Sequence, residues 1–293
     1  MKPRLSIAGM LLLAAILRHA SASGTTINAV HRHAYGANVG WIDARGDGAN
    51  GAVIGQFHCS GALWGANVGW ISLGAGAPTN GWRYGNAAAN DWGVNHDGLG
   101  NLRGMAYGAN VGWIAFEATG DPRVDLLTGH LSGHAWGANV GWIGLSNSQA
   151  FVQTDTLDAG PDTDGDGIPD AWEMKTVGTL VLLGGGGNDH DNDGAPDVDE
   201  YRADTDPDDI NNFFAVTDYI RASTTNTVTW TVEPTRLYRL ETAPAMTNGA
   251  AWVDSGHGLL APGGGPTLTR EVADPTPTAT GFVRAKAVVP LAP

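Results

Sequence analysis

Hydrophobic and polar residues alternate with a two-residue period over much of the first half of the chain, and short turns interrupt the alternation. One stretch reads LSGHAW over residues 131–136, turns at residues 137–139 (GAN), and continues as VGWI over residues 140–143. Alternating runs that flank a turn of Gly and Asn predict a β-hairpin, because both residues tolerate a positive φ. A further strand is expected ahead of this hairpin, at residues 123–126.

The hairpin pattern occurs four times. The octapeptide YGANVGWI begins at Tyr35 and Tyr107, and WGANVGWI begins at Trp64 and Trp136. The first turn glycines of the four copies are separated by 29, 43 and 29 residues. Because a single hairpin cannot bury a core, the pattern predicts an antiparallel array of two- or three-stranded units packed side by side over residues 30–150. Residues 30–147 resemble the glycine- and tryptophan-rich NVGWI repeats of exported bacterial proteins, a resemblance that implies no particular activity.

Tryptophan is concentrated in these copies, and two interpretations of it are open. Exposed rings beside Asn donors would suit the stacking of sugars, whereas buried rings would supply the core of small units. The second interpretation is preferred, with each ring on the inward face beside Val, and it predicts a cost of about 3–5 kcal/mol for Trp113→Ala. The repeated positions in question are Trp41, Trp70, Trp113 and Trp142. His33 and His134 also share one repeat position, which indicates a surface or packing role rather than a metal site.

Acidic residues are concentrated in one segment. Residues 155–210 contain 17 Asp and Glu against Lys175 and Arg202, a local balance of −15, whereas the whole chain carries −14. Such a segment argues against nucleic acid as a partner, since phosphates require Lys and Arg.

The acidic residues fall on two twelve-residue loops with the spacing that wraps a chain around calcium. The first loop offers Asp162, Asp164, Asp166, the backbone carbonyl of Ile168, Asp170 and Glu173 at positions 1, 3, 5, 7, 9 and 12. The second offers Asp189, Asp191, Asp193, the carbonyl of Ala195, Asp197 and Glu200 at the same positions. A Gly at position 6 permits the sharp turn in both loops. The pattern therefore predicts Ca²⁺ as the cofactor, with two metal sites.

The loops depart from an EF-hand, because Pro169 and Pro196 stand at position 8 and a turn-forming stretch rather than a helix enters the first loop. Short helices are expected after the loops, at residues 171–177 and 198–203. Residues 160–210 resemble thrombospondin type 3 repeats and related calcium modules of bacterial surface proteins. That resemblance implies calcium-dependent rigid spacing between domains.

The two ends of the chain carry different signals. Lys2 and Arg4, an apolar run over residues 5–17 and a small-residue site at residues 20–22 predict a signal peptide over residues 1–22 and hence export. No later stretch is apolar for long enough to span a membrane. The lone Cys59 cannot form an internal disulfide, so metal is the expected source of rigidity. Residues 214–293 alternate again, with strands expected at 227–232, 237–242 and 281–289, and predict a small β-sandwich.

The expected fold is therefore mainly β, with a hairpin array at 30–150, a calcium-loop segment with short helices at 155–210 and a β-sandwich-like module at 214–293. The function that follows is a secreted or cell-surface calcium-binding protein with a structural or adhesive role. The alternative is a carbohydrate-binding module that uses the repeat tryptophans, with a surface glycan or another extracellular protein as partner. An enzyme is not expected, because no grouping of acid, base and nucleophile stands out.

Overall fold

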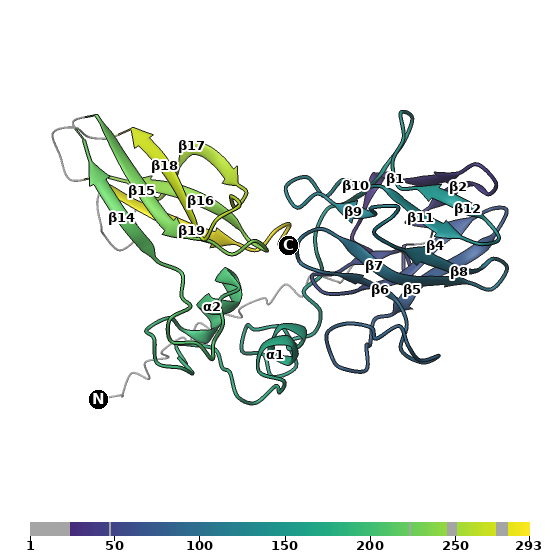
Figure 1. The fold of residues 1–293 in the computed structure, drawn as a ribbon, viewed down its shortest axis with the longest axis horizontal. Helices are drawn as coiled ribbons and strands as arrows, with labels where there is room; N and C mark the ends of the chain where they lie inside the picture. Colours follow the sequence, from purple (N-terminus) through teal and green to yellow (C-terminus); the bar gives the residue numbers. More distant parts are fainter. Residues whose placement is uncertain (1–23, 47, 223, 245–250, 274–280) are drawn as a thin grey trace, which may run out of the picture.

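The computed structural model describes residues 24–46, 48–222, 224–244, 251–273 and 281–293. The predicted signal peptide, residues 1–22, lies outside the described residues. The fold is mainly β with two short helices, as the sequence predicts (Figure 1).

Each copy of the octapeptide forms a β-hairpin. The four hairpins are β1 (Ile27–Gly36) with β2 (Gly40–Asp43), β4 (Cys59–Gly65) with β5 (Gly69–Ala75), β7 (Leu102–Gly108) with β8 (Gly112–Phe116), and β11 (His134–Gly137) with β12 (Gly141–Gly144). Antiparallel pairings β2–β4, β5–β7 and β8–β11 join neighbouring hairpins, and a β12–β1 pairing joins the last to the first. The array is therefore not open: it closes into an eight-stranded barrel (Figure 1).

Five shorter strands extend or cover this barrel. They are β3 (Val53–Ile54), β6 (Val94–His96), β9 (Arg123–Val124), β10 (Leu131–Ser132) and β13 (Val152–Thr154). β13 pairs with β1, β3 with β4 and β6 with β7. The strand expected at residues 123–126 is present as β9, which pairs with β10.

The turn sequence GANVG is explained by how the four turns meet. The side-chain amide of each turn Asn donates a hydrogen bond to the backbone carbonyl of the turn Val in a neighbouring copy. These bonds are Asn38 to Val140 at 3.2 Å, Asn67 to Val39 at 3.0 Å, Asn110 to Val68 at 3.1 Å and Asn139 to Val111 at 3.0 Å. Together they form a closed ring, and the four Val side chains are buried inside it at 3–6% exposure.

Glycine after the turn Val is required by the same arrangement. Gly69 has a φ of +78°, in the left-handed region that favours glycine, and an added Cβ would lie 3.0 Å from the amide nitrogen of Asn110. The glycines at the equivalent positions of the other copies also have φ between 73° and 78°. A side chain at this position would therefore strain the backbone and crowd the asparagine ring.

The prediction that the repeat tryptophans are buried is wrong. The exposed fractions of Trp41, Trp70, Trp113 and Trp142 are 44–48%, while the Ile that follows each of them is at most 5% exposed. An eight-stranded barrel has an interior just wide enough for side chains. Ile and small residues such as Ala34 and Ala106 fill that space, so the larger indoles lie on the outer face. The Val expected to share the Trp face enters the core from the turn instead.

Two three-stranded sheets form the C-terminal part of the chain. One contains β14 (Val216–Arg221), β15 (Thr225–Thr231) and β18 (Thr267–Ala273); the other contains β17 (Val253–Leu260), β16 (Leu237–Ala243) and β19 (Phe282–Val288). Their shared core includes the buried side chains of Trp230, Tyr238 and Leu240. β16 covers the strand predicted at 237–242, while β15 and β19 fall one residue short of the strands predicted at 227–232 and 281–289. The two sheets form the expected sandwich (Figure 1).

Candidate metal centre

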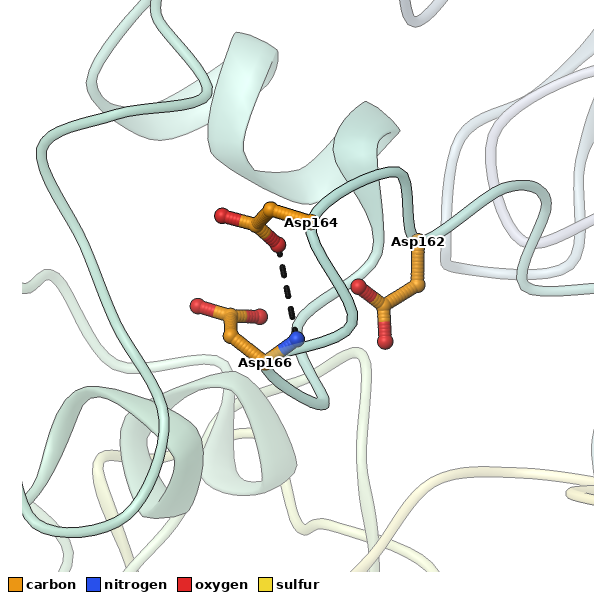
Figure 2. A group of neighbouring side chains, drawn as sticks. All are labelled: Asp162, Asp164 and Asp166. Carbon is orange, nitrogen blue, oxygen red and sulfur yellow. Dashed lines mark hydrogen bonds between the residues drawn. The ribbon is translucent and has the colours of Figure 1, made fainter.

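Two groups of three aspartates lie between the barrel and the C-terminal sheets. Carboxylate oxygens of Asp162, Asp164 and Asp166 all lie within 4.8 Å of one another, and the same holds for Asp189, Asp191 and Asp193. Figure 2 shows the first group on its tight loop, with the carboxylates of Asp164 and Asp166 directed to the same side. Both groups were predicted from the loop spacing.

The backbone of each loop is shaped by its own aspartates. Asp162 accepts hydrogen bonds from the N–H groups of Gly165 at 2.8 Å and Gly167 at 3.0 Å, and Asp166 accepts one from Ile168 at 2.8 Å. The dashed line in Figure 2 is a longer bond, 3.4 Å, from the Asp166 N–H to Asp164. Such Asx turns curl the chain so that successive side chains converge on one point.

The second loop repeats this pattern. Asp189 accepts a hydrogen bond from the Gly194 N–H at 3.0 Å, and Asp193 accepts one from the Ala195 N–H at 2.6 Å. The glycines at position 6, Gly167 and Gly194, have φ of +96° and +97°, which explains why that position is Gly in both loops.

A glutamate from the following helix lies near each group. Glu173 lies on α1 (Asp170–Thr176) and Glu200 on α2 (Asp197–Ala203), and their exposed fractions are 0% and 1%. Among the described residues, neither carboxylate oxygen of Glu173 has a hydrogen-bond partner. Glu200 accepts one bond from Thr205, at 3.3 Å, and its other oxygen has none from the described chain. Buried carboxylate oxygens without partners are costly, so the chemistry of these positions fits a cation as partner.

The electrostatics of both glutamates agree with this geometry. Burial, followed by repulsion from Asp166 and Asp164, raises the pKa of Glu173 to about 7. Burial and repulsion from Asp191 and Asp193 raise the pKa of Glu200 to about 8. Each loop thus sets a buried glutamate near three aspartates, and the negative charges of these side chains repel one another.

The aspartates at loop position 9 have a different environment. Both oxygens of Asp170 accept hydrogen bonds from Thr163, one from the backbone N–H at 2.7 Å and one from the hydroxyl at 2.5 Å. Asp197 similarly accepts bonds from the N–H groups of His190 at 2.8 Å and Gly184 at 2.9 Å. These side chains brace the loops, and their remaining lone pairs suit a contact through water, as position 9 often makes.

At loop position 7 the predicted ligand is a backbone carbonyl, so the side chain is free for another role. Ile168 is fully buried and packs in a small core with Trp172, Leu183 and Tyr201. Ala195 is partly buried. The first loop is therefore anchored to the packed interior at the residue whose carbonyl would face the ion.

One residue at this joint was not identified from the sequence. The Asp204 side chain accepts hydrogen bonds from Trp172 Nε1 at 2.8 Å, from Lys175 Nζ at 3.2 Å and from the Thr235 hydroxyl, and Arg236 lies 3.7 Å away. Although burial acts in the opposite direction, Arg236 and Lys175 hold the pKa of Asp204 below its usual value. Asp204 thus ties α1 and α2 to the C-terminal part of the chain. Its only sequence signal is its place in the segment RADTDP, directly after α2.

The donor sets fit a hard divalent cation, because each offers only oxygen atoms and several of these are buried without partners. No family model matches the chain, and neither a curated protein nor a solved structure matches it. In the part of the chain that the structure describes, no helix is both long and apolar enough to cross a membrane.

Proposed function

We propose that the protein is an exported, calcium-binding structural or adhesive protein in which two calcium ions hold together the segment between the barrel and the C-terminal sandwich. The observation that carries the proposal is the fully buried Glu173, whose carboxylate has no hydrogen-bond partner among the described residues and lies within electrostatic range of Asp166 and Asp164. A protein would not retain such a buried charge unless a cation compensated it.

Calcium is preferred over magnesium because of the number and crowding of the donors. Calcium accepts six to eight oxygen ligands at about 2.3–2.6 Å, whereas magnesium requires a smaller octahedron and keeps several waters. Three Asp carboxylates, a Glu that can bind through both oxygens and a backbone carbonyl supply most of a calcium shell in each loop. The resemblance to thrombospondin type 3 repeats implies the same ion.

A structural role is preferred because the ligands are connected to residues that join the parts of the chain. Tyr201, directly after Glu200, exchanges hydrogen bonds with Gln56 of the barrel at 3.2 and 3.3 Å. The guanidinium of Arg236 donates to the carbonyls of Tyr201 and Arg202, at 2.6 and 2.9 Å. An ion that fixes the start of α2 would therefore fix the contacts that α2 makes with both neighbours.

Calcium titration of the purified mature protein by calorimetry tests the proposal. About two ions are expected per chain, with magnesium a poor substitute. Asp164→Ala should remove the first site and leave the second, and Asp191→Ala should do the reverse. Each variant is therefore a control for the other. A stoichiometry of zero for chelator-treated protein would refute the proposal.

A further inference from the structure

The outer face of the barrel carries eight aromatic side chains, two from each hairpin, which we call the aromatic belt. Its members are Tyr35, Trp41, Trp64, Trp70, Tyr107, Trp113, Trp136 and Trp142, all between 38% and 48% exposed. The two members of each hairpin are cross-strand partners, as in Tyr35–Trp41, where the ring centroids are 4.9 Å apart and tilted by 60°. In three of the four hairpins the two rings contact each other, and Trp92 also packs against Tyr107 and Trp113, so these rings are partly exposed on an ordered sheet.

The four copies differ in the residue beside this belt. Where two hairpins pair, the first aromatic residue of one copy lies opposite the residue two positions after the repeat Trp of the neighbouring copy. The opposite residues are Asp43, Ser72, Ala115 and Gly144, which face Trp64, Tyr107, Trp136 and Tyr35 in that order. Only the first of these positions holds a carboxylate. The aromatic surface is thus repeated four times, whereas a carboxylate stands at this position in one copy only.

That copy also has a hollow in the surface. An open depression of about 410 Å³ is lined by His33, Trp41, Gln149 and Ala150, where the first hairpin meets the loop after β12. His33 lies edge-on to the Trp41 ring, with centroids 6.3 Å apart, and its Nε2 is 4.0 Å from an Asp43 oxygen. An exposed indole, an imidazole and a side-chain amide thus line the hollow, and a carboxylate stands next to the imidazole.

We propose that this hollow binds one pyranose unit of a neutral, β-linked polysaccharide, with the sugar ring stacked on Trp41. The axial C–H groups of such a sugar form an apolar face that matches an indole ring, while its equatorial hydroxyls point outward to donors and acceptors. His33 and Gln149 line the hollow with Trp41 and can meet these hydroxyls. Asp43 stands beside His33, and its other oxygen accepts a hydrogen bond from the Arg45 N–H at 2.8 Å. This site goes beyond the calcium function and uses none of its residues.

The surroundings favour a neutral glycan over an anionic surface. Arg32, the cation nearest this group, is already ion-paired with Asp43 at 3.4 Å. The exposed residues at the tip of this hairpin are the small Ala37 and the polar Asn38, whose amide belongs to the asparagine ring, rather than a large apolar residue that could enter a bilayer. Binding to acidic lipid would need several unpaired cations near the belt.

The barrel supplies a matched control. Trp41 and Trp142 occupy the same repeat position, are both 48% exposed, and each has a His ring edge-on, His33 at 6.3 Å and His134 at 6.1 Å. Trp142 lacks the carboxylate, because Gly144 stands where the first copy has Asp43. A specific sugar site should therefore depend on Trp41 and not on Trp142, whereas general adhesion of aromatic rings should depend on both.

The experiment uses the full mature chain with calcium present and measures binding of cellohexaose and of chitohexaose by calorimetry. At least one hexasaccharide is expected to bind, with affinity about tenfold weaker for Trp41→Ala and unchanged for Trp142→Ala. Gln149 is exposed, so Gln149→Ala should weaken sugar binding by roughly threefold without changing the melting temperature. This variant still tests the site if Trp41→Ala does not fold.

Three results would overturn the site. They are failure of both hexasaccharides to bind, equal losses for the two Trp variants, and Trp41-dependent binding to phosphatidylglycerol vesicles in place of the sugars. Repeating the titration with Asp164→Ala separates this proposal from the calcium proposal, because sugar binding should persist when a calcium loop is disabled.

Discussion

Replacing Glu173 with Gln should have effects of opposite sign with and without calcium. The substitution keeps the shape of the side chain and removes its charge. Without calcium, the charge is buried beside Asp164 and Asp166 and has no hydrogen-bond partner among the described residues, so its removal should stabilise the protein locally. With calcium, the same carboxylate is a proposed ligand, so its removal should weaken binding.

The pKa of Glu173 sets the magnitude and the pH window of the calcium-free effect. Its folded-state pKa of about 7 lies above the ordinary value of 4.5, so the stability that Glu173 provides when protonated is fully present below pH 4.5 and is lost as the pH rises through 7. A shift of this size corresponds to about 3 kcal/mol, and relaxation of the loop with entry of water reduces it to about 2 kcal/mol. Glu173→Gln should therefore stabilise α1 by about 2 kcal/mol at pH 8 and have little effect near pH 4.5.

Hydrogen–deuterium exchange of the peptide that covers α1 measures this local free energy. At 100 times the dissociation constant, calcium should protect the wild-type helix by about 2.7 kcal/mol, and this protection should be largely absent in Glu173→Gln. The exposed Glu117 of the barrel provides a control, since Glu117→Gln should leave α1 unchanged in all conditions. Faster exchange of α1 in calcium-free Glu173→Gln at pH 8, or undiminished protection by calcium, would refute the reasoning.

Three further predictions concern the barrel and the joint. Asn67→Ala should cost about 1–3 kcal/mol in urea unfolding, because the carbonyl of Val39 loses its donor in the asparagine ring; a neutral result would show that the ring is not needed for closure. Ile114→Ala should cost about 2–5 kcal/mol and more than Trp113→Ala, because Ile114 is 2% exposed and Trp113 is 46% exposed; the reverse order of melting temperatures would contradict the outward placement of the ring. Chelation should loosen residues 155–210 while the barrel stays folded, giving a longer or floppier particle in solution scattering, whereas simultaneous loss of barrel structure would show that the parts are not independent.

The local features of this protein could be predicted from its sequence. Gly and Asn mark the four hairpin turns, the period of two marks the strands, and the spacing of aspartates marks both acidic groups. The predicted helices at 171–177 and 198–203 differ from α1 and α2 by one residue at most at each end. Each of these signals depends on residues within one turn, strand or loop, so neighbours in the sequence are sufficient to specify it.

The arrangement of these elements was decided only by tertiary structure. Four equal hairpins have the same alternation in an open array and in a closed barrel, and the long-range pairing of β12 with β1 distinguishes the two. Closure makes the interior too narrow for indoles, which is why Ile114 lies inside and Trp113 outside. The role of Asp204 likewise cannot be read from its local segment RADTDP, because its partners Trp172 and Arg236 are each 32 residues away in the chain. A sequence pattern of short period determines which residues share a face, but the contacts that form between distant segments determine which face is buried.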